Sequence, residues 1–368
     1  MPRIRLAVLF GGRSSEHSIS CVSAGSVLAA IDREKYDVTA IGITPDGRWV
    51  LAPDDPAALT ARGRELPSVD GKTGAIVALA GDPAASGLVV LEPGDVPAEL
   101  GSVDVVFPLL HGPYGEDGTV QGLLELAGLP YVGSGVLGSA VNMDKEYMKL
   151  VLAARGLPVG PWLAVPDRRW RDDPVGVTGE VAALGFPVFV KPARGGSSIG
   201  ISKVRSAAEL PAAMTAAREH DPKVLVEAFV AGREIECAVL QGLAGGVPEA
   251  SLPAEVHVSA DHDYYDFEAK YLTDATAFDV PARLDDAMTQ QVRDLACSAF
   301  LATGCAGLAL VDFFLPDDGE LIVNEVNTMP GFTPMSMYPR MWAASGLDYA
   351  GLVDRLVTLA LQNGTGLR

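Results

Sequence analysis

The order of apolar and polar positions predicts a chain that alternates between strands and helices. Continuous apolar runs at 4–10, 36–44 and 103–110 have the length and composition of buried β-strands. Apolar residues at 119–127 and 285–303 instead recur at helical spacing. Alternating strands and helices are typical of an α/β fold in which helices cover a sheet.

A stretch near the end of the chain has strand character on both sides of a turn. The apolar runs 308–314 and 321–327 flank the sequence Pro-Asp-Asp-Gly-Glu at 316–320, which has the composition of a turn. The three segments predict a β-hairpin. An antiparallel pair here gives the C-terminal part of the chain an α+β character.

Three oxygen-bearing side chains interrupt this apolar hairpin. Glu325 and Asn327 are two positions apart, so they share a strand face, and Asp312 can meet them from the partner strand. Carboxylate and amide oxygens suit Mg²⁺ or Mn²⁺, and Mg²⁺ usually takes only one or two carboxylates from the protein. The alternative is a pair of buried carboxylates in salt bridges, although neither has a cationic neighbour in the sequence.

The first strand leads into a glycine turn and then a helix. Gly11 and Gly12 form the turn, and Ser14 and Ser15 precede Glu16 at the start of the helix. A dinucleotide fingerprint would need G-x-G-x-x-G, which is absent, so NAD is excluded at this turn. Glu16 can hold an ammonium group, or it can simply stabilise the positive end of the helix dipole.

The strand at 103–110 ends in His-Gly-Pro-Tyr-Gly-Glu-Asp-Gly at 111–118. A histidine that follows a buried strand in a glycine-rich loop is well placed for ligand contact or proton transfer. A structural role for His111 is the alternative.

A second glycine-rich loop, at 193–204, lies between two strand-like runs. Consecutive backbone N–H groups without bulky side chains can surround phosphate oxygens, and Lys145 and Lys191 supply cations on either side. The loop is not a Walker P-loop, because G-x-x-x-x-G-K-[ST] occurs nowhere in the chain.

The same loop contains a rival motif. Residues 196–200 match G-x-S-x-G, the nucleophile elbow of serine hydrolases. That elbow requires a strand, a turn and then a helix, whereas 200–204 has the composition of a strand. The phosphate loop is therefore the favoured interpretation.

Two later segments complete the candidate nucleotide site. The strand at 224–227 runs into Ala-Phe-Val-Ala-Gly-Arg-Glu at 228–234, where Phe229 lies between Glu227 and Glu234. Main-chain donors and acceptors beside an aromatic ring can hold an adenine edge, and the two carboxylates can bind ribose hydroxyls. Residues 261–276 are polar and aromatic without a clear period, which predicts a long functional loop.

Composition narrows the class of protein. The 368 residues are 48% hydrophobic and 20% charged, which indicates a folded chain long enough for two or three domains. The net charge of -19 argues against non-specific nucleic-acid binding. Four widely spaced cysteines predict buried thiols in a reducing compartment, namely Cys21, Cys237, Cys297 and Cys305. No apolar run approaches a membrane span and no signal-peptide pattern is present, so we expect a cytoplasmic protein.

Taken together, these motifs resemble the ATP-grasp fold and, within it, the D-alanine:D-alanine ligase family. The resemblance covers essentially the whole chain, and its motifs stand in the family's order. They are G-G-x-S-x-E-H at 11–17, H-G-P-Y-G-E-D-G at 111–118, M-D-K at 143–145, G-G-S-S-I-G at 195–200, Y-D-F-E-A-K-Y at 265–271 and N-E-V-N-T-M-P-G-F-T at 324–333.

The resemblance implies three domains, 1–138, 139–231 and 232–368, with ATP held between the second and the third. It implies ATP contacts by Lys145, Lys191, Ser197, Glu227, Phe229, Val230, Glu234 and Lys270. It implies two Mg²⁺ ions on Asp312, Glu325 and Asn327. Substrate contacts are expected from Glu16, His111, Ser336 and the Met337 amide, catalytic roles from Glu16, Ser197, Tyr271 and the Gly331 N–H, and a homodimer as the assembly.

The implied reaction joins two D-alanines through an acyl phosphate, for peptidoglycan precursor synthesis. One position departs from the family pattern, which has Ala-Arg-Val-Asp where this chain has Leu310 in place of the arginine. Losing such a cation predicts slow turnover, unless Arg283 or Arg340 substitutes for it. The alternatives are a D-alanine:D-lactate ligase, which the Tyr271 motif disfavours, and a catalytically weakened nucleotide-binding homologue.

Overall fold

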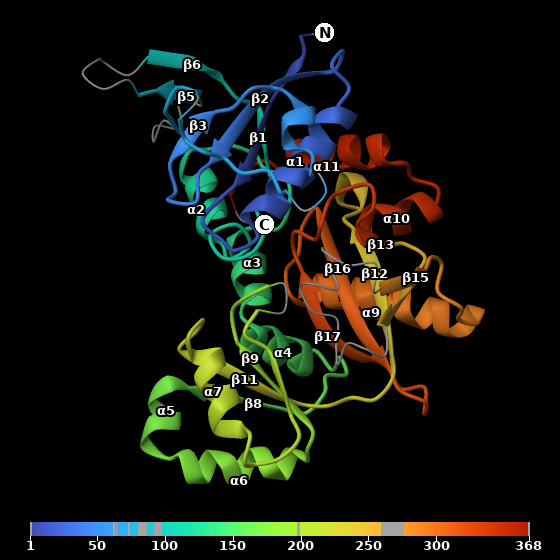
Figure 1. Cartoon of the computed structure of the whole chain (residues 1–368). Coiled ribbons are helices and arrows are strands. Elements are labelled where there is room, and N and C mark those ends of the chain that lie inside the picture. The colour runs from blue at the N-terminus through green and yellow to red at the C-terminus, as the bar shows by residue number, and fades with distance from the viewer. Residues whose placement is uncertain are drawn as a thin grey trace.

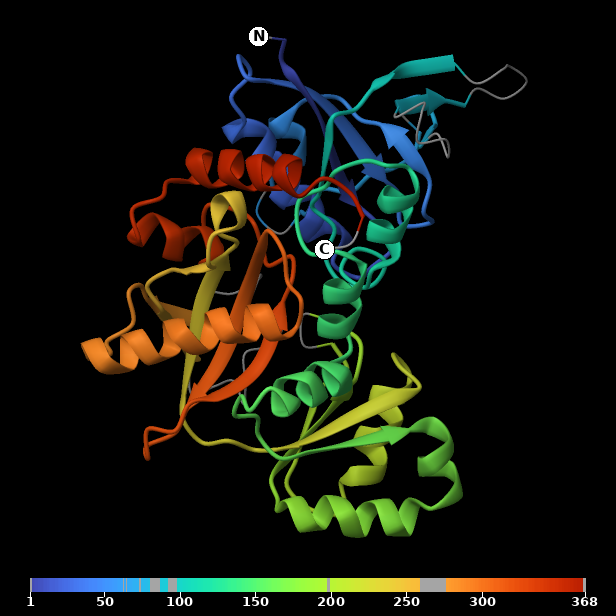
Figure 2. The same ribbon diagram turned by 180° about the vertical axis from the view of Figure 1, so that it is seen from behind.

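The computed structural model describes residues 2–61, 63, 65–72, 74–79, 87–91, 98–196, 199–258 and 276–366. Its elements form three groups, and the chain passes through them in order from the N-terminal part to the C-terminal part (Figure 1). The last helix, α11 (Tyr349–Asn363), returns to the first group, so both ends of the chain lie in the same region (Figure 2).

The first group contains a largely parallel sheet in the strand order β3-β2-β1-β7. Strand β1 pairs in parallel with β2 and β7, while β3 is antiparallel to β2. A small antiparallel sheet, β4-β5-β6, lies beside it. The elements are β1 (Ile4–Gly11), α1 (His17–Ala30), β2 (Tyr36–Ile43), β3 (Trp49–Leu51), a 3₁₀ turn (Pro56–Leu59), β4 (Val77–Leu79), β5 (Gly87–Val90), β6 (Ala98–Ser102), β7 (Val105–Pro108), α2 (Thr119–Leu126) and α3 (Val136–Met143).

The second group is an antiparallel sheet in the order β10-β9-β11-β8, packed against helices. Strand β9 extends through Lys191 and Pro192 to the start of the glycine-rich loop. The elements are α4 (Lys145–Ala154), β8 (Trp162–Pro166), α5 (Asp167–Asp172), α6 (Pro174–Leu184), β9 (Val188–Pro192), β10 (Ser202–Val204), α7 (Leu210–Arg218) and β11 (Lys223–Ala228).

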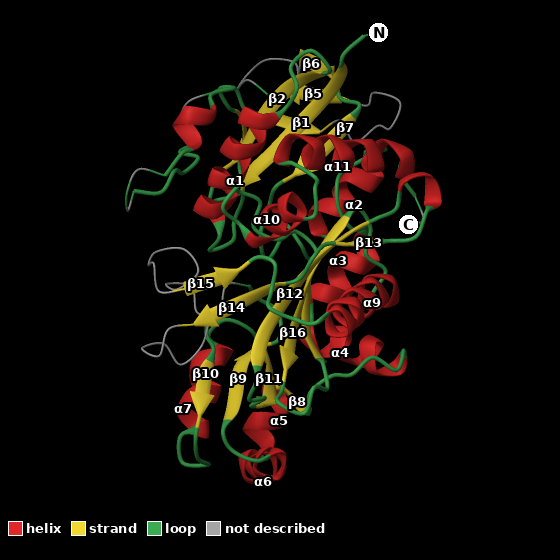
Figure 3. Cartoon of the chain, turned by 90° about the vertical axis from the view of Figure 1, so that its right-hand side faces the viewer, coloured by secondary structure: helices red, strands yellow, loops and turns green. Residues whose placement is uncertain are grey.

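The third group is a six-stranded sheet in the order β15-β14-β12-β16-β17, with β13 paired to β12. Helix α9 covers one face of this sheet (Figure 3). The predicted hairpin is confirmed as β16 and β17, which pair antiparallel. The elements are β12 (Arg233–Leu240), a 3₁₀ turn (Leu243–Gly245), β13 (Glu249–Ala250), β14 (Ala254–Val258), β15 (Thr276–Asp279), α9 (Asp286–Ala302), β16 (Leu308–Leu315), β17 (Ile322–Asn327), α10 (Met337–Ala344) and α11 (Tyr349–Asn363).

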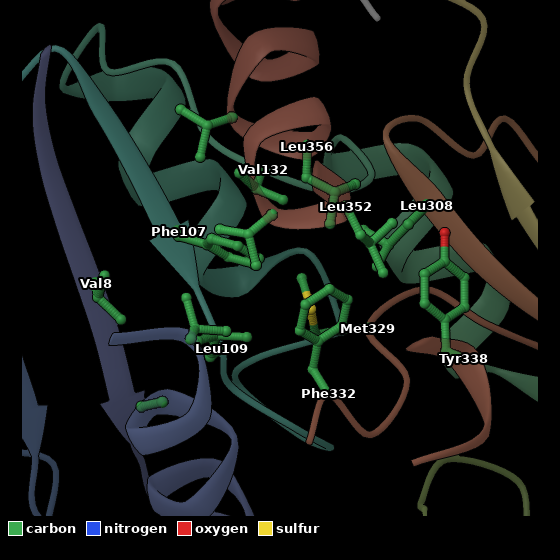
Figure 4. Close-up of a cluster of buried hydrophobic side chains, with 14 of the residues drawn as sticks. Val8, Phe107, Leu109, Val132, Leu308, Met329, Phe332, Tyr338, Leu352 and Leu356 are labelled. Carbon is green, nitrogen blue, oxygen red and sulfur yellow. The ribbon is translucent and has the colours of Figure 1, made fainter. Parts of the chain in front are cut away.

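One apolar cluster joins the first group to the third. Figure 4 shows Phe107 and Val132 of the first group facing Leu308, Leu352 and Leu356. Phe332 lies in the middle of the cluster, with ring centroids 5.8 Å from Phe107, 5.9 Å from Tyr338 and 5.7 Å from Tyr349. Of the last two helices, α10 packs on β12, whereas α11 packs against α1 and β7.

The cysteine prediction is confirmed in its main point. All four thiols are free; Cys21 and Cys237 are buried, and Cys297 and Cys305 are partly buried. Burial raises the pKa of Cys21 and Cys237 to about 12, so both are protonated and unreactive at neutral pH. None of the helices within the described ranges combines the length and hydropathy that a bilayer crossing needs.

Candidate active site

Two neighbouring cavities contain most of the predicted site residues. The first lies between the sheets of the second and third groups, and it is called the nucleotide cavity because predicted ATP contacts line it. Its wall includes residues of β9, β11, β12, β16 and β17. Six of the predicted ATP contacts line it, namely Lys145, Lys191, Glu227, Phe229, Val230 and Glu234. The other two, Ser197 and Lys270, lie outside the described residues.

Glu227 holds two lysines on the floor of the nucleotide cavity. Lys149 Nζ lies 2.7 Å from one carboxylate oxygen, and Lys191 pairs with the other. Burial alone would raise the pKa of Glu227, but the two ammonium groups outweigh it and lower the pKa to about 2. The site therefore keeps two cations in place beside one carboxylate, and this arrangement suits a polyphosphate.

Helix α4 carries two of the lysines that line this cavity, Lys145 and Lys149. Asp144 caps the helix by accepting the N–H of Tyr147 and also pairs with Lys223 at 2.6 Å. Lys145 and Lys149 are one helical turn apart on the same face, so both point toward the hairpin. Lys149 Nζ donates to the Asn324 carbonyl at 3.3 Å.

The glycine-rich loop connects two antiparallel strands, β9 and β10. A strand thus follows the loop where a nucleophile elbow needs a helix, so the serine hydrolase alternative is wrong. Lys145 Nζ donates to the Gly195 carbonyl at 3.0 Å, and its backbone N–H donates to Ala193, which fixes the loop against α4.

The three predicted metal ligands meet on the hairpin. Asp312 is in register with Glu325, and Asn327 Nδ2 lies 3.3 Å from Asp312 Oδ2. The register shifts between Asp312 and Phe313, so Asn324 is an extra residue on β17, and such bulges re-aim the side chains next to them. The donor set of two carboxylates and one carboxamide fits Mg²⁺.

The hairpin ligands separate the nucleotide cavity from a second cavity, the substrate cavity. The residues that line both are Lys145, Gly195, Gly196, Glu236, Asp312 and Glu325. Lys145 Nζ is 3.2 Å from Glu325 Oε2. A group in one cavity can therefore react with a group in the other at a point surrounded by these carboxylates and this lysine.

Glu16 occupies the far side of the substrate cavity. It stands at the N-cap of α1, its side chain is not used as a cap, and only 7% of the residue is exposed. A Cβ on Gly112 or on Gly196 would come within 2.6 or 2.7 Å of Glu16 Oε2. Two backbone segments therefore approach this carboxylate as closely as glycine allows.

His111 is buried beside Glu16 and has partners on both ring nitrogens. Its Nδ1 lies 2.9 Å from the Met329 carbonyl and 3.8 Å from Glu116 Oε1, and its Nε2 lies 3.1 Å from Ser23 Oγ. Burial opposes the charged form, but the nearby carboxylate of Glu116 outweighs it, so the net effect is a raised pKa for His111. Burial also raises the pKa of Glu116.

The other end of the substrate cavity is the start of α10. Ser336 is the N-cap residue, its hydroxyl accepts the Thr333 N–H at 3.1 Å, and Met337 is the first helical residue. Backbone N–H groups in a first helical turn have no intrahelical partner, so they can bind a carboxylate. Gly331 lines the same end, and a Cβ there would come 3.1 Å from Ser336 Oγ.

Leu310 lines the substrate cavity two positions before Asp312, and it is 8% exposed. Of the two arginines that could replace the missing charge, Arg283 pairs with Asp279, and 84% of its side chain is exposed. The Arg340 guanidinium lies 5.5 Å from the Phe278 ring centroid and 3.6 Å from Met337 Sδ. Phe278 and Met337 both line the cavity, so Arg340 is the nearer candidate.

Sequence reasoning missed three charged residues of the two cavities, Lys149, Glu116 and Glu236. Lys149 could have been found from its position one turn after Lys145. Glu236 is two positions after Glu234 on β12 and faces Asp312 across the pair with β16. Glu116 is part of the motif at 111–118, in which only His111 had an expected role.

Another cluster with metal-binding side chains lies on β14 and β15. Its members are Glu255, His257 and Asp279. Arg233 donates two hydrogen bonds to Glu255, and Arg283 pairs with Asp279 at 3.1 Å. The arginines neutralise both carboxylates, so this cluster has the character of an ion-pair network.

Comparison with known proteins agrees with the geometry. The family model of the D-ala D-ala ligase N-terminus matches residues 5–134, and that of the D-ala D-ala ligase C-terminus matches residues 151–358. The D-alanine--D-alanine ligase of Arthrobacter sp. (strain FB24) is 57% identical over 99% of this chain and 96% of its own length. The enzyme of that name from Mycobacterium tuberculosis (strain CDC 1551 / Oshkosh) is 56% identical over 99% and 97%.

Solved structures show the same fold over the full length. The D-alanine-D-alanine ligase from Coxiella burnetii superimposes with a TM-score of 0.82 at 36% identity, covering 99% of this chain and 95% of its own. The VanG D-Ala:D-Ser ligase from Enterococcus faecalis gives 0.83 at 34% identity, covering 98% and 100%. This chain therefore has the ATP-grasp fold and belongs to the D-alanine–D-alanine ligase family.

Proposed function

We propose that this protein is an ATP-dependent D-alanine–D-alanine ligase that makes D-alanyl-D-alanine for peptidoglycan precursor synthesis. The observation that carries the proposal is the wall shared by two cavities, where Lys145, Asp312 and Glu325 face both sides. Phosphoryl transfer depends on positioning and charge neutralisation, and this wall provides both.

ATP occupies the nucleotide cavity in this proposal. Lys145 and Lys191 hold phosphate oxygens, Phe229 and Val230 contact the adenine, and Glu227 and Glu234 lie at the polar edge of the nucleotide. Ser197 and Lys270 are also assigned to ATP, on the sequence motifs alone. Asp312, Glu325 and Asn327 hold two Mg²⁺ ions, or Mn²⁺ in their place, which when bound neutralise phosphate charge.

The first D-alanine binds in the substrate cavity with its ammonium group on Glu16 and His111 nearby. Its carboxylate oxygen attacks the γ-phosphorus, the bond to the β-phosphate oxygen breaks, and ADP leaves. The product is an acyl phosphate. The position of Glu16 supports this role, because its residue is buried and lines the substrate cavity.

The second D-alanine binds at the start of α10, with its carboxylate on Ser336 and the Met337 N–H. Its amine attacks the acyl carbon, the nitrogen loses a proton, and inorganic phosphate leaves with the former carboxylate oxygen. The Gly331 N–H faces the oxyanion that forms during this attack. These groups lie at one end of the cavity, and their position supports the assignment.

Closure of the site is assigned to the loop at 261–276. Tyr271, Ser197 and Glu16 are proposed to form a hydrogen-bonded set that shuts the loop and excludes water, since water would hydrolyse the acyl phosphate. All but the last residue of the loop, as well as Ser197, lie outside the described residues. These roles stay predictions.

Further proposals concern the organisation of the protein. The domain ranges 1–138, 139–231 and 232–368 each contain their own sheet, which supports the three-domain division. A homodimer is supported by exposed apolar side chains on α2 and α3, among them Leu126 at 75% and Leu137 at 69%. The net charge of -19 supports the absence of a nucleic-acid partner, and the free cysteines support a cytoplasmic location without a membrane partner.

The test is mass-resolved product formation with ATP, Mg²⁺ and D-alanine, followed alongside ADP release. D-alanyl-D-alanine formed in step with ADP supports the proposal. A preference for added D-lactate would favour the depsipeptide ligase instead. ADP release without dipeptide, or no turnover, would favour the catalytically weakened homologue, for which Leu310 is the only argument.

A further inference from the structure

A segment of the first group closes one side of the substrate cavity. Residues 65–72, here called the strap, contribute Leu66 to the cavity wall beside Ile19 and Val22 of α1. Ile19 and Val22 follow Glu16 at intervals of three residues, so they continue from it along the helix. The three side chains are apolar parts of the lining to which Glu16 also belongs.

His17 ties the strap to the start of α1. Its Nδ1 lies 2.7 Å from the Gly12 carbonyl, so this nitrogen carries the proton and donates it. The other nitrogen, Nε2, then accepts the Val69 N–H at 3.0 Å and the Ser68 hydroxyl at 3.1 Å. His17 is 7% exposed, so water does not readily replace these bonds.

Val69 can pack against the first group because Gly11 and Gly42 have no side chains. A Cβ on Gly42 would come 2.8 Å from Val69 Cγ1, and a Cβ on Gly11 would come 3.1 Å from Val69 Cγ2. Gly11 also has φ of +88°, and its Cβ would come 2.3 Å from the Ile43 carbonyl oxygen. Val69 is 9% exposed and packs in the core, so the strap has a fixed position.

We propose that the strap sets the size limit for the first substrate. Leu66 is the specificity-determining residue, because it faces the space beside Glu16 into which the substrate side chain extends. His17 is a positioning residue: its hydrogen bonds to Ser68 and Val69 fix the strap and, with it, the position of Leu66. The inference rests on the proposed function, in which Glu16 binds the ammonium group of the D-amino acid that becomes phosphorylated.

This arrangement admits a methyl group and excludes longer unbranched D-α-amino acids at the first position. The two positions can be told apart in the product, since the phosphorylated amino acid becomes the N-terminal residue. The probe is D-norvaline, supplied at equal concentration with D-alanine, ATP and Mg²⁺. Fragment mass spectrometry then reads each end of the dipeptide separately.

Leu66→Ala is the main variant. We expect it to raise the ratio of norvaline to alanine at the N-terminal position roughly tenfold or more, because a methylene in an apolar pocket discriminates by about that factor. The ratio at the C-terminal position should not change. Leu301→Ala, on the outer face of α9 where the leucine is 63% exposed, is the matched control and should change neither ratio.

His17→Ala should also raise the norvaline-to-alanine ratio at the N-terminal position, and it should raise the KM of the first D-alanine. His17→Gln keeps an acceptor for the Val69 N–H and should restore most of the selectivity. If His17 has only a structural role, His17→Ala should lower the melting temperature but should not change the norvaline-to-alanine ratio at the N-terminal position alone. That result overturns its positioning role.

An unchanged N-terminal ratio in Leu66→Ala, or an equal change at both ends, overturns the inference. Wild-type turnover of D-alanine alone separates this failure from that of the proposed function. Without dipeptide from the wild type, both are wrong. With normal dipeptide formation and an unchanged ratio, only the strap inference is wrong.

Discussion

The two cavities that meet at Asp312 and Glu325 differ in the charges that they add beyond their shared wall. The nucleotide cavity adds two lysines, Lys149 and Lys191, which pair with Glu227, and a second carboxylate, Glu234, so its added charges balance. The described lining of the substrate cavity adds the carboxylates of Glu16 and Glu116 and no further lysine or arginine.

This difference fits the ligand that each cavity is proposed to bind. A polyphosphate carries several negative charges, and lysines already held in place bind it without first losing side-chain freedom. An amino acid brings its own ammonium group to the acidic end of the substrate cavity, while its carboxylate can be met by backbone N–H groups and a hydroxyl. The shared carboxylates then need metal ions when ATP is bound, because they would otherwise repel its phosphates.

Asp312→Asn tests the shared wall and should have the largest effect. The variant keeps the shape of the side chain but weakens the proposed metal site, so turnover should fall roughly 10³-fold. The Mg²⁺ concentration needed for half-maximal ADP release and for a thermal shift should rise. Asp317→Asn, in the exposed hairpin turn, is the control. An unchanged Mg²⁺ dependence in Asp312→Asn would contradict the metal assignment.

Glu227→Gln tests the lysine pair of the nucleotide cavity through stability. A carboxylate whose pKa is about 2 in the native protein and near 4.5 when unfolded contributes about 3 kcal/mol at neutral pH. The variant leaves Lys149 and Lys191 buried without their counter-charge, so the free energy of unfolding should fall by about that amount. Urea unfolding at pH 7 measures it.

The pH dependence of stability gives an independent check on Glu227. Its depressed pKa stabilises the native state above about pH 4.5, and this contribution is lost as the pH falls toward 2. The variant should therefore lose less stability than the wild type over that range. Glu180→Gln removes the half-exposed partner of Arg169 and should shift stability by less than about 1 kcal/mol at any pH.

Leu310→Arg tests whether the substrate cavity lacks a cation that it needs. The new guanidinium would lie on the same strand face as Asp312, and we expect turnover to rise by roughly 10²-fold. Steady-state ADP release with D-alanine measures the change. If the rate stays the same, the slow-enzyme hypothesis is wrong, and Arg340→Met should then lower turnover because Arg340 already supplies the charge.

Sequence patterns predicted those parts of the molecule that depend on local order. The hairpin could be placed because its turn residues and its two-residue alternation lie within one short stretch, and Asp312 indeed faces Glu325. The start of α1 could be placed because the glycine turn and the serines that precede Glu16 lie within a few residues of it. In both cases the deciding interactions connect near neighbours.

The features that the sequence did not predict depend on contacts between distant segments. Lys149 belongs to the nucleotide cavity only because β11 brings Glu227 to it across 78 positions of sequence. The strap depends on His17 meeting Val69, and α11 packs on α1 because the chain returns to its first group. A bulge such as the one at Asn324 shifts the register by one residue without any marker in the composition.

Substitutions of Asp144, the cap of α4, should have the smallest effect. They test the contrast between the cavities, because α4 contributes Lys145 and Lys149 to the nucleotide cavity but only Lys145 to the substrate cavity. Asp144→Ala removes the cap of α4 and should lower the free energy of unfolding by about 1 kcal/mol. Asp144→Asn keeps a capping oxygen but loses the charge that pairs with Lys223.

The two Asp144 variants separate the cap from the ion pair. If the cap holds the lysines in place, Asp144→Ala should raise the KM for ATP by a few-fold while Asp144→Asn stays near the wild type. The KM values for D-alanine should change less, since Glu16, Ser336 and Met337 are carried by α1 and the start of α10. Equal changes in both sets of KM values would mean that α4 supports the two cavities alike, and the contrast would then rest on charge alone.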